Sequence, residues 1–138
     1  MSKKSGLVVL VSLFAGGCAA TFTSNRPKEV TLKDTYDPSA VRDAAAHVLF
    51  RAHLEVVAEN DRSLSAAEAP CGYTIEYRDR GFVVRAAPLA PRADGLIDGR
   101  CLDTEDKLAK HIVKEVERPA RLAVKEEKRR RRAERTAA

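Results

Sequence analysis

The chain has 138 residues and a hydrophobic fraction of 44%, which excludes global disorder and allows one folded domain but not two. Its formal net charge of +5 comes from 25 basic and 20 acidic residues. Residues 125–135 alone hold seven Lys or Arg and three Glu. An anionic partner is therefore expected to meet the C-terminal end of the chain rather than the domain.

The first residues have the layout of an export signal. Lys3 and Lys4 precede a compact apolar run at 6–15, and small residues lead from that run to Cys18. This layout resembles the start of bacterial lipoprotein precursors, in which signal peptidase cuts directly before a cysteine that then carries acyl chains. The resemblance implies a cleaved signal peptide over residues 1–17 and lipidation of Cys18.

The residue after this cysteine bears on the destination of the protein. In Gram-negative members of the family, a residue other than Asp at this place accompanies sorting to the outer membrane, and Ala19 fits that pattern. The resemblance thus implies a lipid anchor in the outer membrane, with the domain facing the periplasm. An alternative is an ordinary secretory cut after Ala20, which would release a soluble periplasmic protein. A membrane-spanning helix is disfavoured, because about ten apolar residues are too few.

Two cysteines remain once Cys18 is assigned to the lipid. Cys71 and Cys101 are an even pair in an oxidising compartment, which predicts a disulfide. The bond would close a ring of about 30 residues and stabilise the fold by roughly 3.6 kcal/mol.

The domain is expected to follow a flexible tether over residues 18–36, which shows no sustained period. Asp37 and Pro38 then predict the start of a helix that ends near His53. Its apolar residues share one face; they are Val41, Ala45, Val48, Leu49 and Ala52.

Strands are predicted to follow this helix. Residues 54–59 could extend the helix or form a strand, and the turn-like residues 60–63 favour the strand. Alternating apolar residues at 73–77 and the run at 82–85 predict a hairpin around the turn at 79–81. Residues 86–100, with two Pro and two Asp-Gly pairs, predict a long loop.

A last helix is expected to begin at a cap formed by Asp103 or Thr104. Pro119 should break or kink it, which leaves a basic helical or disordered tail over residues 119–138. The order of elements predicts an α+β fold over residues 37–118. It is a small two-layer sandwich, in which an antiparallel sheet of about four strands is flanked by the N-terminal and C-terminal helices.

Residues that could carry catalysis or bind a metal do not form a recognisable pattern. The histidines His47, His53 and His111 and the two domain cysteines lack the spacing of a zinc chelate. Ser65 has no elbow motif to present it, and the carboxylates Glu55 and Glu59 are typical of a solvated pair. No catalytic residue, metal or cofactor is predicted.

The basic tail is the candidate binding element. Its anion-binding residues are expected to be Lys128, Arg129, Arg130, Arg131 and Arg132, because arginine can hold phosphate through two hydrogen bonds. Nucleic acid is disfavoured, since no aromatic residue interleaves with the tail to stack bases and the chain is expected to be exported. A solvated tail with no specific ligand is the alternative.

These features predict a membrane-anchored envelope lipoprotein that acts as a non-catalytic structural or interaction module. Its expected partners are the membrane, reached through the lipid anchor, and an envelope protein or an anionic envelope polymer. The alternatives are a soluble periplasmic protein that binds polyanions through its tail, and a small periplasmic enzyme.

Overall fold

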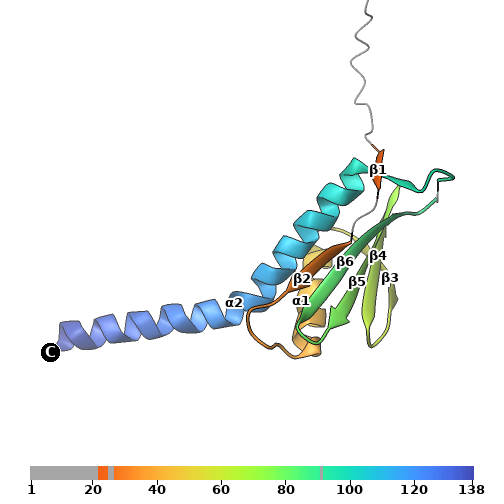
Figure 1. Cartoon of the computed structure of the whole chain (residues 1–138). Coiled ribbons are helices and arrows are strands. Elements are labelled where there is room, and N and C mark those ends of the chain that lie inside the picture. The colour runs from red at the N-terminus through yellow and green to blue at the C-terminus, as the bar shows by residue number, and fades with distance from the viewer. Residues whose placement is uncertain (1–21, 25–26, 91) are drawn as a thin grey trace, which may run out of the picture.

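The computed structural model describes residues 22–24, 27–90 and 92–138 (Figure 1). The described elements, in chain order, are β1 (Phe22–Ser24), β2 (Lys28–Thr31), α1 (Pro38–Arg51), β3 (Glu55–Glu59), β4 (Ser63–Glu68), β5 (Cys71–Arg78), β6 (Gly81–Pro88), β7 (Leu96–Asp98) and α2 (Gly99–Ala137).

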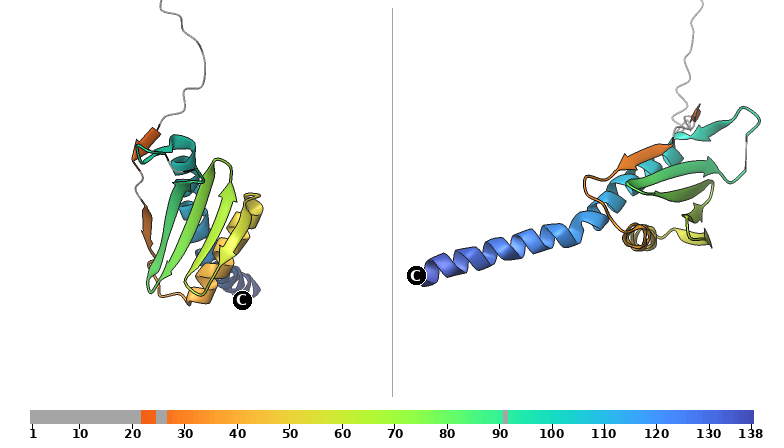
Figure 2. Two further views of the ribbon diagram at one scale, coloured as in Figure 1. Left: turned by 90° about the vertical axis from the view of Figure 1, so that its right-hand side faces the viewer. Right: turned by 60° about the horizontal axis from the view of Figure 1, so that its bottom comes forward.

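The fold is α+β, as predicted, and has two layers. A five-stranded antiparallel sheet has the order β2-β6-β5-β4-β3. Both helices cover one face of this sheet and leave the other face open (Figure 2). Helix α1 packs over β3, β4 and β5, and α2 packs over β2, β6 and β5. The core lies between the layers.

The sheet is larger than the predicted sheet of about four strands. Residues 28–31, expected to belong to the tether, form β2 and pair with β6 as an edge strand. Leu32 directly after β2 is buried in the core. A tether over all of residues 18–36 is therefore wrong, because its second half contributes backbone hydrogen bonds and an apolar side chain to the domain.

Helix α1 begins where the sequence predicts. The side chain of Asp37 accepts a hydrogen bond from the backbone N–H of Ser39 at 2.8 Å, and Pro38 is the first helical residue. The helix ends at Arg51, and His53 then adopts a left-handed backbone conformation with φ of 57°. The chain reverses there and enters β3, which confirms the strand interpretation of this segment.

The predicted hairpin is β5 and β6, joined by the turn at residues 79–80. Along β5 the side chains of Tyr73 and Ile75 are buried against the helices, whereas Thr74 and Glu76 face the open side of the sheet. This alternation is the physical basis of the prediction, because successive side chains of a strand point to opposite faces.

The long loop predicted over residues 86–100 is wrong in three respects. Strand β6 runs to Pro88, residues 96–98 form β7, and α2 already begins at Gly99. Asp98 caps α2 in place of Asp103 or Thr104, since its carboxylate accepts the N–H of Arg100 at 2.9 Å. The same carboxylate pairs with the guanidinium of Arg100 at 2.7 Å.

Helix α2 continues for 39 residues and passes through Pro119. Of the two outcomes predicted at Pro119, the break does not occur and the kink does. Figure 1 shows the helix changing direction between the arm that packs on the sheet, which ends near Glu117, and a free arm over residues 118–137. A proline inside a helix removes one backbone donor and bends the axis. Near the bend, the guanidinium of Arg121 donates a hydrogen bond to the backbone carbonyl of Lys114.

One carboxylate is buried between α2 and the sheet. Glu105 is only 4% exposed, and its Oε2 accepts a hydrogen bond from the backbone N–H of Ala86 at 2.6 Å. Ala86 lies on β6 opposite Tyr73 of β5, so Glu105 ties α2 to the backbone of the sheet. Burial raises the pKa of its carboxyl above the ordinary 4.5, an effect that the hydrogen bond to Ala86 partly offsets.

We expect the Glu105→Gln variant to change how stability depends on pH. Because the folded state raises the pKa of Glu105, it favours the protonated form, and this contribution to the unfolding free energy is lost as pH rises above about 4.5. Gln cannot titrate and lacks this slope. Denaturant unfolding at pH 4 to 7 should show wild type losing stability relative to the variant as pH rises. A difference that stays constant with pH would contradict this account.

Candidate functional site

The structure describes two of the three cysteines to which the sequence analysis assigns a role. Cys18, the expected lipidation site, lies outside the described residues. Cys71 and Cys101 form the predicted disulfide, with their Cα atoms 5.6 Å apart. The bond joins the start of β5 to the first turn of α2, and both cysteines are buried. These two residues therefore serve the fold and are not available as metal ligands.

The histidines lie apart from one another. His47 on α1 approaches Glu115 of α2, with 3.8 Å between Nε2 and Oε1. His53 is in the turn after α1, and His111 lies beside a small hollow between the two helices. Within residues 22–24, 27–90 and 92–138, no three His, Cys, Asp or Glu side chains come together as a metal site.

The hydroxyl and carboxylates considered for catalysis are also separated. Ser65 lies on the sheet face away from the helices, where its hydroxyl is 3.3 Å from that of Thr74, whereas His111 belongs to the helical layer. Glu55 and Glu59 are both exposed on the edge strand β3. A bulge lies between them, and their register partners Ala67 and Leu64 point to opposite faces of the sheet. The two carboxylates therefore face different surroundings.

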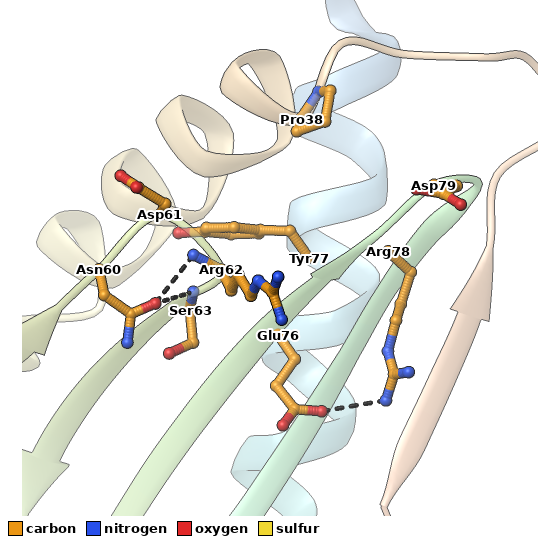
Figure 3. A pocket seen from close by; sticks show the side chains of 9 residues that line it. All are labelled: Pro38, Asn60, Asp61, Arg62, Ser63, Glu76, Tyr77, Arg78 and Asp79. Carbon is orange, nitrogen blue, oxygen red and sulfur yellow. Dashed lines mark hydrogen bonds and ion pairs between the residues drawn. The ribbon is translucent and has the colours of Figure 1, made fainter.

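A hollow with a volume of about 640 Å³ lies at one end of the sheet (Figure 3). Its walls come from the β3–β4 turn, the end of β5 and the start of α1. The lining residues are Pro38, Asn60, Asp61, Arg62, Ser63, Glu76, Tyr77, Arg78 and Asp79.

Most of the defined contacts around this hollow hold the fold together. The Asn60 side chain accepts the backbone N–H groups of Arg62 and Ser63 at 2.8 and 2.9 Å and so fixes the β3–β4 turn. The carboxylate of Glu76 pairs with Arg78 at 3.1 Å. Figure 3 shows these interactions as dashed lines. The hollow gathers neither a histidine nor the carboxylates of β3.

Tyr77 is the exception in this region. Its hydroxyl oxygen is buried and has no hydrogen-bond partner among the described residues. Burial raises the pKa of Tyr77 to about 12, and the carboxylate of Glu59 adds to the shift. The hydroxyl therefore keeps its proton at neutral pH and can act as a hydrogen-bond donor but not as a base.

The expected anion-binding residues lie on the free arm of α2. All side chains after Glu117 are exposed apart from Glu127, which is partly buried by its ion-pair partners. Glu127 pairs with Arg131 at 2.7 Å and with Arg130 at 3.0 Å, and Arg130 also lies 3.9 Å from Glu134. Two of the four consecutive arginines are therefore neutralised within the tail.

The remaining members of the predicted set keep their charge uncompensated. In the part of the chain that the structure describes, Lys128, Arg129 and Arg132 have no carboxylate within 4.0 Å. The run of four arginines thus divides into two residues that pair with glutamates, Arg130 and Arg131, and two that do not, Arg129 and Arg132.

A longer alignment of basic residues follows the solvent side of α2. From residue 107 to residue 135, successive steps of three or four residues connect nine positions that are all Lys or Arg, and every one is exposed. We call this set the α2 basic line; it comprises Lys107, Lys110, Lys114, Arg118, Arg121, Lys125, Lys128, Arg132 and Arg135. Such steps keep side chains on one helix face.

The α2 basic line was not anticipated from the sequence, although its spacing is visible there. The consecutive arginines predict binding by the tail alone, and Pro119 predicts where that tail begins. Continuity of the helix through that residue joins the two halves of the line. The line lies opposite the buried face of α2, which includes Leu108, Ile112 and Val116.

Comparisons with known proteins do not assign the chain to a family. A scan of protein-family models, a search of curated proteins and a search of solved structures find nothing that matches the chain. Among the described helices, none combines the length and the apolar character needed to span a membrane. The fold and its surfaces therefore define a small two-layer α+β protein with a long basic helix.

Proposed function

We propose that the protein is a membrane-anchored lipoprotein of the bacterial envelope, which acts as a non-catalytic structural or interaction module. The observation that carries the proposal is the disulfide between Cys71 and Cys101. Such bonds form and persist in oxidising compartments, which supports export. The bond also uses the two domain cysteines and leaves Cys18 available for the lipid.

The position of the N-terminal strand supports a short anchor. Cys18 precedes Phe22 by four residues, which span at most about 14 Å. Strand β1 pairs with β7, whose last residue caps α2. Figure 1 shows β1 beside the start of α2 and the C-terminus at the far end of the free arm. A lipid on Cys18 would hold the β1 end near the membrane and direct the helix away from it.

The surfaces support an interaction role. One face of the sheet is uncovered by helices, and the free arm of α2 is exposed on all sides. The hollow at the end of the sheet is open and carries charges of both signs, from Asp61, Arg62 and Asp79. Open, extended surfaces of this kind suit contact with a polymer or a protein. Most catalysis instead depends on a closed site from which water is excluded.

The Cys18→Ser variant tests the anchor. We expect the wild-type chain, expressed in a Gram-negative host, to begin at Cys18, to be heavier by its acyl chains and to enter the detergent phase. The variant should remain in the aqueous phase without the added mass. Ala20→Ser is the matched control, because it alters a neighbouring residue and leaves the cysteine in place; it should behave like wild type. Intact mass and phase partitioning give the result.

Two outcomes would contradict the anchor. A soluble wild-type product that begins after Ala20 would make this a free periplasmic protein, and the alternative of a soluble polyanion-binding protein would replace the lipoprotein. An uncleaved chain recovered with reduced cysteines would exclude export altogether.

A further inference from the structure

We infer that the α2 basic line is a docking surface for a linear polymer with repeated phosphate groups, which binds along the helix. The inference does not depend on the anchor at Cys18. It rests on the length of the line, on the distribution of carboxylates around it and on the residue types that it contains.

The line extends over both arms of α2. It begins at Lys107, where the helix packs on the sheet, and ends at Arg135 in the free arm. These 28 residue steps correspond to about 42 Å of helix, with one basic side chain every 5 Å or so. A compact anion would contact only one or two of these side chains. A partner that uses the whole line must itself be extended and repeatedly charged.

Most of the line carries uncompensated charge. Lys110 pairs with Asp106 at 2.6 Å and Arg118 pairs with Glu115 at 3.5 Å. Arg121 donates to a backbone carbonyl. The other members have no carboxylate within 4.0 Å among the described residues; they are Lys107, Lys114, Lys125, Lys128, Arg132 and Arg135. Guanidinium and ammonium groups in this state bind phosphate oxygens through charge-assisted hydrogen bonds.

The carboxylates of the free arm lie to the other side of the helix. Glu126, Glu127 and Glu134 are all outside the three-and-four series, and Glu127 holds Arg130 and Arg131 there. The free arm is therefore divided lengthwise into a basic face and a mixed face, whereas in the sheet-packed arm the face opposite the line is buried. A polyanion meets attraction along the first and partial repulsion along the second, which fixes the side on which it binds.

The same features disfavour a flat membrane and a second helix. Helices that lie on a bilayer bury an apolar face, and every member of the line is Lys or Arg. The exposed apolar residues of the free arm, Leu122 and Val124, are outside the line. A coiled-coil partner would likewise need an apolar seam. Since α2 changes direction between its two arms, a flexible polymer can follow both arms more easily than a rigid plane can.

The test uses the full chain in a neutral detergent and fluorescently labelled inorganic polyphosphate of about 60 units. We expect saturable binding, measured by anisotropy, that weakens with salt. With six unpaired cations engaged, the slope of log K against log salt should be about −4, from roughly −0.7 per phosphate on a single strand. Circular dichroism spectra verify that each variant keeps its helix.

Two double variants distinguish the effect of the α2 basic line on binding from the effect of total charge. Arg132→Gln with Arg135→Gln removes two arginines from the line, and Arg130→Gln with Arg131→Gln removes two from the mixed face. The first pair should weaken binding on the order of 10- to 30-fold near 0.1 M salt and reduce the slope by about 1.4. The second should bind within about 3-fold of wild type, because its charges are already paired. Equal losses would overturn the inference.

A third double variant tests the sheet-packed arm. Lys107→Gln with Lys114→Gln should reduce affinity as much as the line variant of the free arm, although both lysines lie outside the tail. Binding like wild type would overturn a continuous line. In a parallel measurement, tighter binding to phosphatidylglycerol vesicles than to polyphosphate would overturn the polymer in favour of a membrane surface. Neither result affects the intact mass or the phase partitioning that test the anchor at Cys18. Either proposal can therefore be contradicted without the other.

Discussion

Replacement of both Cys71 and Cys101 by alanine is expected to lower the unfolding free energy by about 3.6 kcal/mol. The bond closes a loop with a sequence separation of 30 residues, and an unfolded chain without this constraint gains the corresponding entropy. For a domain of roughly 110 residues, a loss of this size lowers Tm by about 15 °C. Thermal unfolding followed by circular dichroism measures the shift.

A reductant provides the control for this prediction. Wild type in dithiothreitol should approach the Tm of the double variant, whereas the double variant should be indifferent to it. Cys18→Ser should unfold like wild type, because this third cysteine takes no part in the bond. If reduction leaves the wild-type Tm unchanged, the disulfide does not stabilise the fold.

The Gly81→Ala variant is expected to lose about 2–3 kcal/mol through overpacking. A Cβ atom at Gly81 would lie 1.8 Å from the backbone oxygen of Val30 and 3.2 Å from the Cα of Thr31. These obstacles are main-chain atoms of β2, so the whole edge strand must move. That displacement strains the β2–β6 register and withdraws the adjoining Leu32 from the core.

Two other glycines serve as matched controls. An added Cβ at Gly72 meets the flexible side chain of Leu89 at 3.1 Å, which can move aside. Gly95 has φ of +68° but open space around it, so alanine there costs roughly 1 kcal/mol of backbone strain. Denaturant unfolding should therefore rank Gly81→Ala as clearly the most destabilising of the three. Equal effects at Gly81 and Gly72 would refute the crowding by β2.

The elements that the sequence predicts well carry local signals. Asp37 and Pro38 mark the start of α1 through a cap and a fixed φ, and both act within two residues of their position. The β5–β6 hairpin is visible because its strands are adjacent and alternate. In each case the residues that determine the structure are neighbours in the chain.

The elements that were missed depend on distant pairing. Strands β1 and β7 have three residues each and meet across more than 70 positions, so neither shows a period. Strand β2 forms because β6 offers it an edge. Asp98 becomes the cap of α2 because β7 ends there. Asp103 is an equally suitable cap residue, so the sequence alone does not show which of the two begins the helix.

The candidate surface was predicted in part. The concentration of basic residues at the C-terminal end is evident from composition, but their sorting around the helix depends on which arginines pair with Glu127. The α2 basic line also crosses Pro119, and the sequence predicted a boundary at that residue. Only the continuous helix shows that Lys114 and Lys125 belong to one face.

The position of the disulfide also has a mechanical consequence. If the chain is held at its N-terminal end and a partner pulls on α2, tension that reaches Cys71 passes directly to Cys101 through the sulfur bridge. The roughly 30 residues between them, which include β6 and β7, are excluded from the path and cannot be drawn out. The cross-link thereby withholds about 100 Å of extension, so that a pulled molecule would lengthen only through the segments before β5 and through α2 beyond Cys101.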